Sequence, residues 1–196
     1  MTVSVYVKKI SDVKVAHLSS EARRLEIDGV KNEGVKREKC AVWKLLEDSV
    51  QAHFGVSPKD VSFRKSESGK WKCDICEFSL SHSRDLVAVA ISDEPVGVDI
   101  ELYDERKLLR IASRLLTGDE LKELDALAEE KKGEYIIKAW TGKEAAFKIM
   151  GEGALLPKKE ARKEEYIYRR KIELDGDIYF LAVATKKERE IAVNII

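Results

Sequence analysis

The sequence predicts an α+β fold made of two similar α/β lobes, with an active site in the cleft between them. Two observations predict it. Segments with the period of strands and segments with the period of helices follow the order strand, helices, strands, and this order then repeats. The halves are similar in length and the break falls near Pro95. We therefore expect lobes of residues 1–95 and 96–196, related by a pseudo-two-fold axis.

The first half is expected to contain one strand, two helices and then further strands. Residues 3–7 alternate apolar and polar side chains, which predicts an opening strand. A serine pair at 19–20 can cap a helix that begins at Glu21. A longer helix is expected over 33–54, because its apolar residues recur at helical spacing and Gly55 follows. The remaining segments are strands over 61–64, 78–80 and 86–91, and a turn over 66–70.

The second half is expected to repeat the pattern. Thr117 and Glu120 have the spacing of a capping box, which predicts a helix that ends at Gly133. Asp175 and Gly176 indicate a β-hairpin. The remaining elements are helices over 107–116 and 135–150 and strands over 96–101, 166–174, 178–185 and 191–195.

The composition argues against several classes of protein. The 196 residues include 36 basic and 36 acidic side chains, so no overall field favours a nucleic acid or a membrane as partner. No apolar run is long enough to span a membrane, and the first ten residues do not have the pattern of a signal peptide. Cys73-x-x-Cys76 has no second pair that would complete a zinc site. We expect a cytoplasmic protein with ordinary thiols.

Two carboxylates lie close together on the strand expected over 96–101. Asp99 and Glu101 project from the same face because alternate strand residues point the same way, and Gly97 leaves space beside them. Carboxylates aimed at one point repel each other unless a cation or base lies between them. Magnesium prefers such oxygen ligands. The pair is consistent with a magnesium site, or with solvated acids on an edge strand.

Two other groups have both a functional and a structural interpretation. Glu144 and Lys148 share a face of the helix over 135–150, where they can serve a metal and a phosphate or form a surface ion pair. The Ser81-His82-Ser83 run follows a predicted strand. Its histidine can donate a hydrogen bond to a phosphate or be structural. Neither group assigns a function by itself.

The order and spacing of four motifs resemble the 4′-phosphopantetheinyl transferases. These motifs are Gly-Lys at 69–70, Ser-His-Ser at 81–83, Gly-Val-Asp-Ile-Glu at 97–101 and Trp-x-x-Lys-Glu-x-x-x-Lys at 140–148. Because Asp99 lies in mid-chain, the sequence is most similar to the long, two-lobed, surfactin-synthetase-activating type. That type is monomeric and activates fatty-acid, polyketide and nonribosomal-peptide synthases, whereas the short type is trimeric and lacks an N-terminal half.

The resemblance implies a reaction and a catalytic centre. The 4′-phosphopantetheine arm of coenzyme A would pass to a serine of an acyl or peptidyl carrier protein, with release of 3′,5′-ADP. By resemblance, Asp99, Glu101 and Glu144 bind Mg²⁺, and Glu144 or a metal-bound water is the base. Lys148 would contact the pyrophosphate and help the leaving group depart. Glu120 would be an acidic residue near the metal.

The resemblance also implies a binding site for coenzyme A. His82 and Ser81 would contact a phosphate, Lys70 would lie beside the nucleotide, and Lys148 would reach the pyrophosphate. The sequence departs from the family's usual pattern at Trp71, where proline is common, and at Ser79, where asparagine is common. A basic cluster in the N-terminal half usually holds the 3′-phosphate, and the candidates are Arg23, Arg24, Arg37 and Lys39.

Two other functions remain open. The chain could be a module that binds a carrier protein or coenzyme A without transfer, although an intact set of three carboxylates with Lys148 argues against it. It could also be another magnesium-dependent phosphoryl enzyme, such as a phosphodiesterase that removes the same arm. No second metal site or histidine cluster is evident for such hydrolysis.

Overall fold

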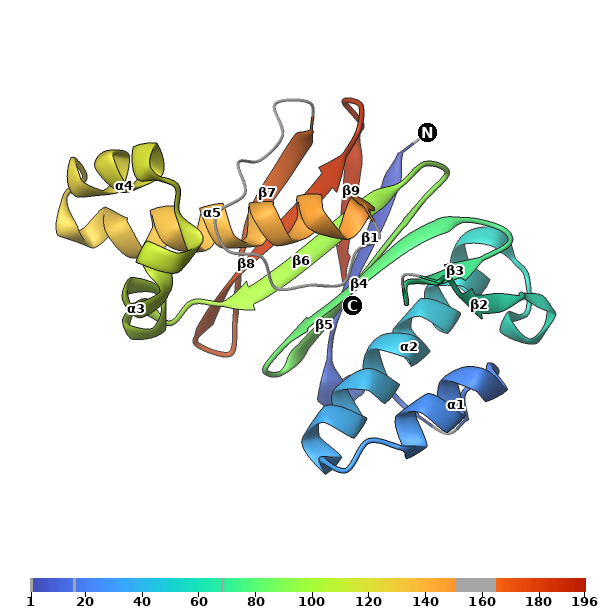
Figure 1. Ribbon diagram of the computed structural model, residues 1–196. Helices are drawn as coiled ribbons and strands as arrows, with labels where there is room; N and C mark the ends of the chain where they lie inside the picture. The colour runs from blue at the N-terminus through green and yellow to red at the C-terminus, as the bar shows by residue number, and fades with distance from the viewer. Residues whose placement is uncertain (1, 16, 68, 151–164) are drawn as a thin grey trace.

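The computed structural model describes residues 2–15, 17–67, 69–150 and 165–196, and it confirms a mixed α+β fold (Figure 1). The strands are β1 (Val3–Lys9), β2 (Phe63–Lys65), β3 (Trp71–Cys73), β4 (Glu77–Ser83), β5 (Leu86–Ser92), β6 (Val96–Leu102), β7 (Tyr166–Leu174), β8 (Asp177–Thr185) and β9 (Ile191–Ile195). The helices are α1 (Glu21–Asp28), α2 (Glu33–Phe54), α3 (Glu105–Leu115), α4 (Gly118–Asp125) and α5 (Glu129–Met150). Short 3₁₀ turns, η1 (Ile10–Asp12) and η2 (Pro58–Asp60), follow β1 and α2.

The strands form two main sheets and one small hairpin. The first sheet has the order β4-β5-β1-β9, and the second has the order β6-β8-β7. All pairs are antiparallel except β1 with β9, which are parallel. Strands β2 and β3 pair as a separate antiparallel hairpin. The last strand of the chain therefore belongs to the sheet of the first half, while the lobe boundaries at Pro95 stay a prediction.

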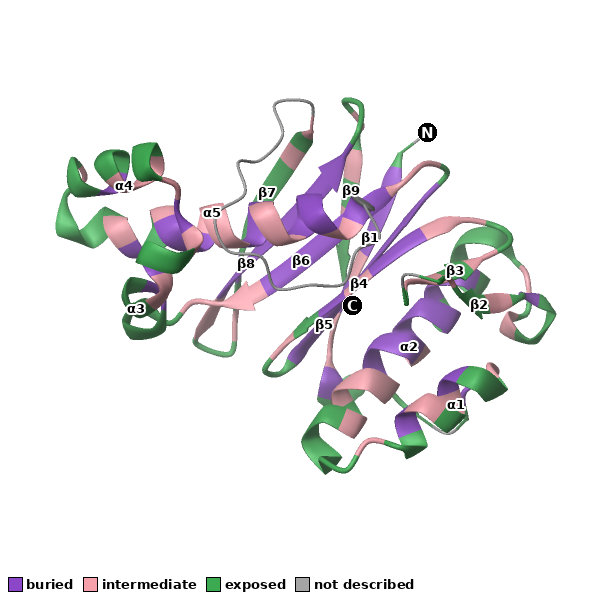
Figure 2. Ribbon diagram, viewed as in Figure 1, coloured by how far each residue is buried: buried purple, intermediate pink, exposed green. Residues whose placement is uncertain are grey.

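The described elements stack in four layers: α2, the first sheet, the second sheet and α5. Val87, Val89 and Ile91 of β5 face α2, and the alternate residues Leu86 and Ala88 face the second sheet. Every residue of β5 is buried because it is covered on both faces. Figure 2 shows the buried residues gathered on the central strands and on the inner faces of α2 and α5.

Several local signals in the sequence determine where helices begin and end. The Ser20 side chain accepts a hydrogen bond from the Arg23 backbone N–H at the start of α1, and Thr117 forms the predicted capping box. Gly55 closes α2 with a φ of 69°. None of the helices in the described part of the chain is long and apolar enough to cross a membrane.

The predicted helix break at Gly133 is wrong, because Gly133 lies inside α5. Helix α4 ends at Asp125, and α5 begins at Glu129 and runs through the glycine. A Cβ on Gly133 would lie 2.1 Å from the Tyr103 hydroxyl oxygen. The glycine therefore permits close packing of Tyr103 against α5 rather than ending a helix.

Candidate functional site

Helix α5 lies directly on strand β6, and Gly97 is the point of contact. A Cβ at Gly97 would lie 1.8 Å from the carbonyl oxygen of Ala145, so only glycine fits there. Gly97 shares its face of β6 with Asp99 and Glu101, since strand residues alternate. This close approach brings the helix residues that flank Ala145 over the two carboxylates. We call this region the β4–β6–α5 junction.

Lys148 of α5 is bonded to the edge of β6. Its amine donates to Asp99 Oδ1 at 2.8 Å and to the carbonyl oxygen of Val98 at 2.9 Å. The pair is sheltered, with 28% of the lysine side chain and 7% of the aspartate side chain exposed. A hydrogen bond between two charged groups in such surroundings is stronger than one at the surface. The contact joins two motifs that lie far apart in the sequence.

Asp99 is buried, and its two oxygens differ. Oδ1 accepts hydrogen bonds from the Ser81 hydroxyl at 2.9 Å and from Lys148. Oδ2 is also buried, but it has no hydrogen-bond partner among the described residues. Buried polar atoms in native proteins almost always have a partner, so this oxygen is available to an ion or a solvent molecule. A carboxylate oxygen in this situation is a suitable ligand for a hard cation.

Glu101 and Glu144 are both affected by the charge of Asp99. Burial raises the pKa of Glu101 to about 7, the Asp99 charge acts in the same direction, and a 2.9 Å hydrogen bond from Ser83 to Glu101 Oε2 opposes the shift. Burial and then the Asp99 charge raise the pKa of Glu144, against the opposing charge of Lys148. Like charges held together in a sheltered place are typical of a cation site.

The three carboxylates are not yet arranged as a ligand set. Within the described residues, no three Asp, Glu, His or Cys side chains are grouped closely enough to hold a metal ion. Asp99 is fixed by two hydrogen bonds and Glu101 by one. Binding a metal at this place therefore requires side-chain rotation of Glu101 or Glu144.

The Ser81-His82-Ser83 run is divided between two faces of β4. Ser81 and Ser83 face β6, whereas His82 faces α2, where its Nδ1 lies 3.4 Å from Glu38 Oε2. Burial lowers the pKa of His82, while the Glu38 charge acts in the opposite direction. The Ser81 hydroxyl, expected beside coenzyme A, is bonded within the protein. Ser79 and Ser83 have no predicted role from the sequence, although serines at every second residue of a buried strand are unusual enough to be a signal.

Lys70 and Glu120 have described partners next to the junction. The Lys70 amine donates to the carbonyl oxygen of Lys148 at 2.8 Å, in the last turn of α5, and burial lowers its pKa. Glu120 accepts from the backbone N–H of Thr117 at 2.7 Å and pairs with Lys143 at 2.5 Å. Glu120 therefore caps the start of α4 and forms an ion pair with Lys143, the residue before Glu144. Its catalytic role stays a prediction.

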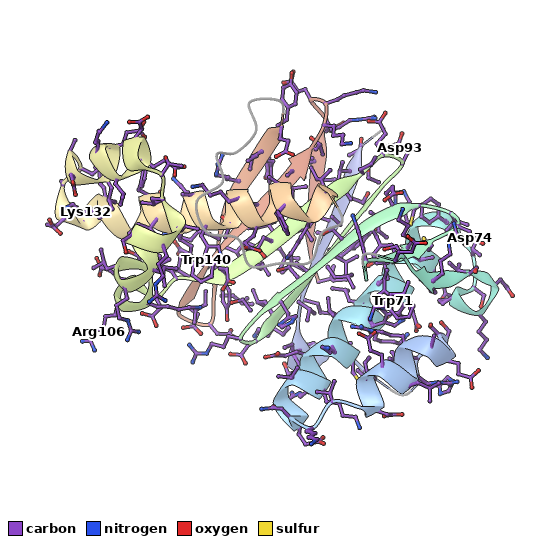
Figure 3. All side chains as sticks on the ribbon, in the orientation of Figure 1. Trp71, Asp74, Asp93, Arg106, Lys132 and Trp140 are labelled. Carbon is purple, nitrogen blue, oxygen red and sulfur yellow. The ribbon has the colours of Figure 1, made fainter. Side chains whose placement is uncertain are left out.

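The four basic candidates for the 3′-phosphate lie in different surroundings. Arg23 is buried, with its guanidinium over the rings of Trp43 and Trp71, and so belongs to the core. Figure 3 labels Trp71, the second of these rings. Arg24 is bonded to His17. Arg37 lines a concave pocket of about 310 Å³ together with Glu38. The charge of Lys39 helps to lower the pKa of His82, so Lys39 is the candidate on the His82 side.

The second half of the chain matches a known family. Residues 95–190 match the family model described as the 4′-phosphopantetheinyl transferase superfamily. The chain is 35% identical over 105 residues to the 4′-phosphopantetheinyl transferase gsp of Aneurinibacillus migulanus (53% of this chain, 44% of the relative). It is 41% identical over 112 residues to psf-1 of Bacillus pumilus (56% and 48%), and 30% identical over 139 residues to Sfp of Bacillus subtilis strain 168 (62% and 61%), both also named 4′-phosphopantetheinyl transferases. The chain thus spans about half the length of the curated relatives it matches.

Proposed function

Because this chain belongs to the 4′-phosphopantetheinyl transferase superfamily, we propose that it transfers 4′-phosphopantetheine from coenzyme A to a serine of an acyl or peptidyl carrier protein. The other product is 3′,5′-ADP. The observation that carries the proposal is Asp99 at the β4–β6–α5 junction, which has one oxygen bonded to Lys148 and the other buried without a partner among the described residues. This arrangement offers a cation and a phosphate adjacent binding positions.

A magnesium ion fits the oxygen ligands of the junction. Asp99 Oδ2 accepts no hydrogen bond from the described residues, and the charge of Asp99 raises the pKa values of Glu101 and Glu144. A divalent cation removes that repulsion. We assign Asp99, Glu101 and Glu144 as its ligands, after rotation of the Glu144 side chain. When bound, magnesium supplies charge neutralisation on the pyrophosphate as the bond to phosphorus breaks.

The side chains of α5 would act on the substrates. Lys148 presents an ammonium group beside Asp99, where it can bind the pyrophosphate and stabilise the negative charge of the departing 3′,5′-ADP. Glu144 would take the proton of the carrier serine. A serine hydroxyl is a weak nucleophile until a positioned base takes its proton.

The coenzyme A nucleotide would lie on the other side of the junction. Lys70 is half-buried there and His82 is exposed, with Lys39 on the His82 side. His82 is proposed to contact a phosphate and Lys70 the nucleotide, whereas the Ser81 hydroxyl, expected at the phosphate by resemblance, donates its proton to Asp99. Glu120 is proposed to act through Lys143, which precedes the assigned ligand Glu144. The expected monomer and the cytoplasmic location stay predictions.

Mass spectrometry of an intact carrier protein tests the reaction. An apo carrier incubated with this protein, coenzyme A and Mg²⁺ should gain the mass of one phosphopantetheinyl group, and EDTA should prevent the gain. An Asp99→Asn variant keeps the side-chain size but should not support the gain, while Asp119→Asn, on the exposed surface of α4, should behave as wild type. Binding of coenzyme A without any gain on several carriers would mean a binding module. Loss of the group from a holo carrier would mean a phosphodiesterase.

A further inference from the structure

Strands β4 and β6 are edges of different sheets that lie side by side. No backbone hydrogen-bonded ladder joins them in the described structure, although the two strands are in extensive contact. Their connection comes from serine side chains on alternate positions of β4. The hydroxyl oxygens of Ser79, Ser81 and Ser83 accept hydrogen bonds from the backbone N–H groups of Val98, Ile100 and Leu102, at 3.0, 3.2 and 3.0 Å. These oxygens replace the carbonyl groups that a paired strand would supply.

Two of the three hydroxyls also donate to the carboxylates of β6. Ser81 donates to Asp99 Oδ1 and Ser83 donates to Glu101 Oε2, both at 2.9 Å. Ser79 contacts no carboxylate in the part of the chain that the structure describes. A serine hydroxyl has one proton and two acceptor positions. Because the β6 N–H occupies one acceptor position, the direction of the proton is restricted, and it points to the neighbouring carboxylate.

We propose that Ser83 is a positioning residue that orients Glu101 for a divalent cation, and that Ser81 does the same for Asp99. Each hydroxyl engages one carboxylate oxygen, so the other oxygen of the same group is directed away from β4. For Asp99 that other oxygen is the buried, unpaired Oδ2. The inference rests on the magnesium site of the proposed function, and it assigns to β4 the hydrogen bonds that fix two of the three ligands.

A purely structural role must be separated from this one, because all three serines also join β4 to β6. Ser79 supplies the matched control: it makes the same bond to a β6 N–H at the same length as Ser83 but touches no described carboxylate. Ser79→Ala therefore removes only the connection between strands. Ser83→Ala removes the connection and the donor to Glu101. Ser83→Thr keeps the hydroxyl on a side chain that suits a strand.

The test is Mn²⁺ binding to the metal-free protein, followed by electron paramagnetic resonance without coenzyme A or carrier. We expect S83A to weaken Mn²⁺ binding by about 10- to 100-fold, the usual effect of removing a group that orients a ligand. S79A should bind as wild type, and S83T should restore most of the affinity. Thermal unfolding should show similar losses of stability for S83A and S79A, since each loses one bond between strands.

The outcomes distinguish the inference from the proposed function. Wild-type affinity in S83A, or equal weakening in S79A and S83A, would overturn the positioning role. Tight Mn²⁺ binding that follows the expected order, combined with no transfer to any carrier, would leave the inference standing and reject the proposed reaction. If wild type binds no Mn²⁺, both the metal site and the positioning role are wrong. If S83A does not fold, Ser83→Cys, which keeps the shape but is a weak donor, makes the same comparison.

Discussion

The amine of Lys148 lies 2.8 Å from Asp99 Oδ1 and 2.9 Å from the carbonyl oxygen of Val98. One residue of α5 is thereby bonded to both the backbone and the side chain of β6. The helix can lie this close because Gly97, two residues before Asp99, has no side chain. The position of the lysine amine thus depends on a glycine of another motif.

Replacing Lys148 by alanine should reduce the rate of carrier modification by roughly 10²- to 10³-fold, the usual cost of losing a charge that stabilises the leaving group. The rate is measured by mass spectrometry at saturating Mg²⁺. Lys138→Ala is the matched control, because Lys138 lies on the same helix and pairs only with Glu134 near the surface in the described contacts. A K148A rate equal to that of K138A would remove Lys148 from the reaction.

Gly97→Ala should both destabilise the protein and impair transfer. The new methyl group would lie 1.8 Å from the Ala145 carbonyl oxygen, so α5 must move away from β6. Overpacking of this kind costs about 1–3 kcal/mol or more in the free energy of unfolding. Gly118→Ala is the control, because a Cβ there meets nothing within 4 Å. Denaturant unfolding and the transfer assay check both effects; a G97A protein as stable and active as G118A would contradict the close approach.

Acid should remove the stabilising effect of Glu26 at very low pH. Burial disfavours the charged form of this carboxylate, but hydrogen bonds from Arg23, Lys65 and Trp71 lower its pKa from 4.5 to about 2. A lowered pKa in the folded state means that the contribution is fully present above about pH 4.5 and is lost as the pH falls through about 2. Unfolding free energies of wild type and Glu26→Gln should therefore converge over this window. A difference that does not depend on pH would contradict the shift.

Cys73 should react with iodoacetamide at lower pH than an ordinary thiol. Its Sγ lies 3.3 Å from that of Cys76, and a hydrogen bond from Cys76 lowers the pKa of Cys73 to about 7. The thiolate is the reactive form, so the midpoint of the pH-dependent alkylation rate should lie below that of an ordinary thiol. Cys76→Ala should move that midpoint upward. Cys40, whose pKa is raised by burial, serves as the internal control, resolved by peptide mass spectrometry; equal pH profiles for Cys40 and Cys73 would contradict the assignment.

Local signals predict most of the secondary structure, because the groups that determine it lie near one another in the chain. Thr117 and Glu120 form the predicted capping box, and Asp175 with Gly176 forms the predicted hairpin turn. The prediction at Gly133 is wrong because the glycine is needed for a contact with the Tyr103 side chain, and Tyr103 lies far from it in the sequence. A glycine in a helical segment has the same local appearance whether it ends the helix or admits a neighbour.

The candidate site is only partly predictable for the same reason. The spacing of Asp99 and Glu101 on one strand determines that they share a face. No local pattern indicates that Ser83 lies against Glu101, because β4 and β6 become neighbours only after both sheets have formed. The three carboxylates are also not grouped as a ligand set within the described residues, which a strand pattern cannot reveal.

The bond from Lys70 to the Lys148 carbonyl joins residues 78 positions apart in the sequence. The serines of β4 likewise bond to residues beyond Pro95, so one part of the junction consists of contacts between the two halves of the chain. Contacts of such long range slow folding, because the entropy of closing the intervening chain is lost before the contact forms. A ligand that binds only the assembled junction therefore holds β4 and Lys70 against β6 and α5, and its binding free energy adds to the free energy of unfolding.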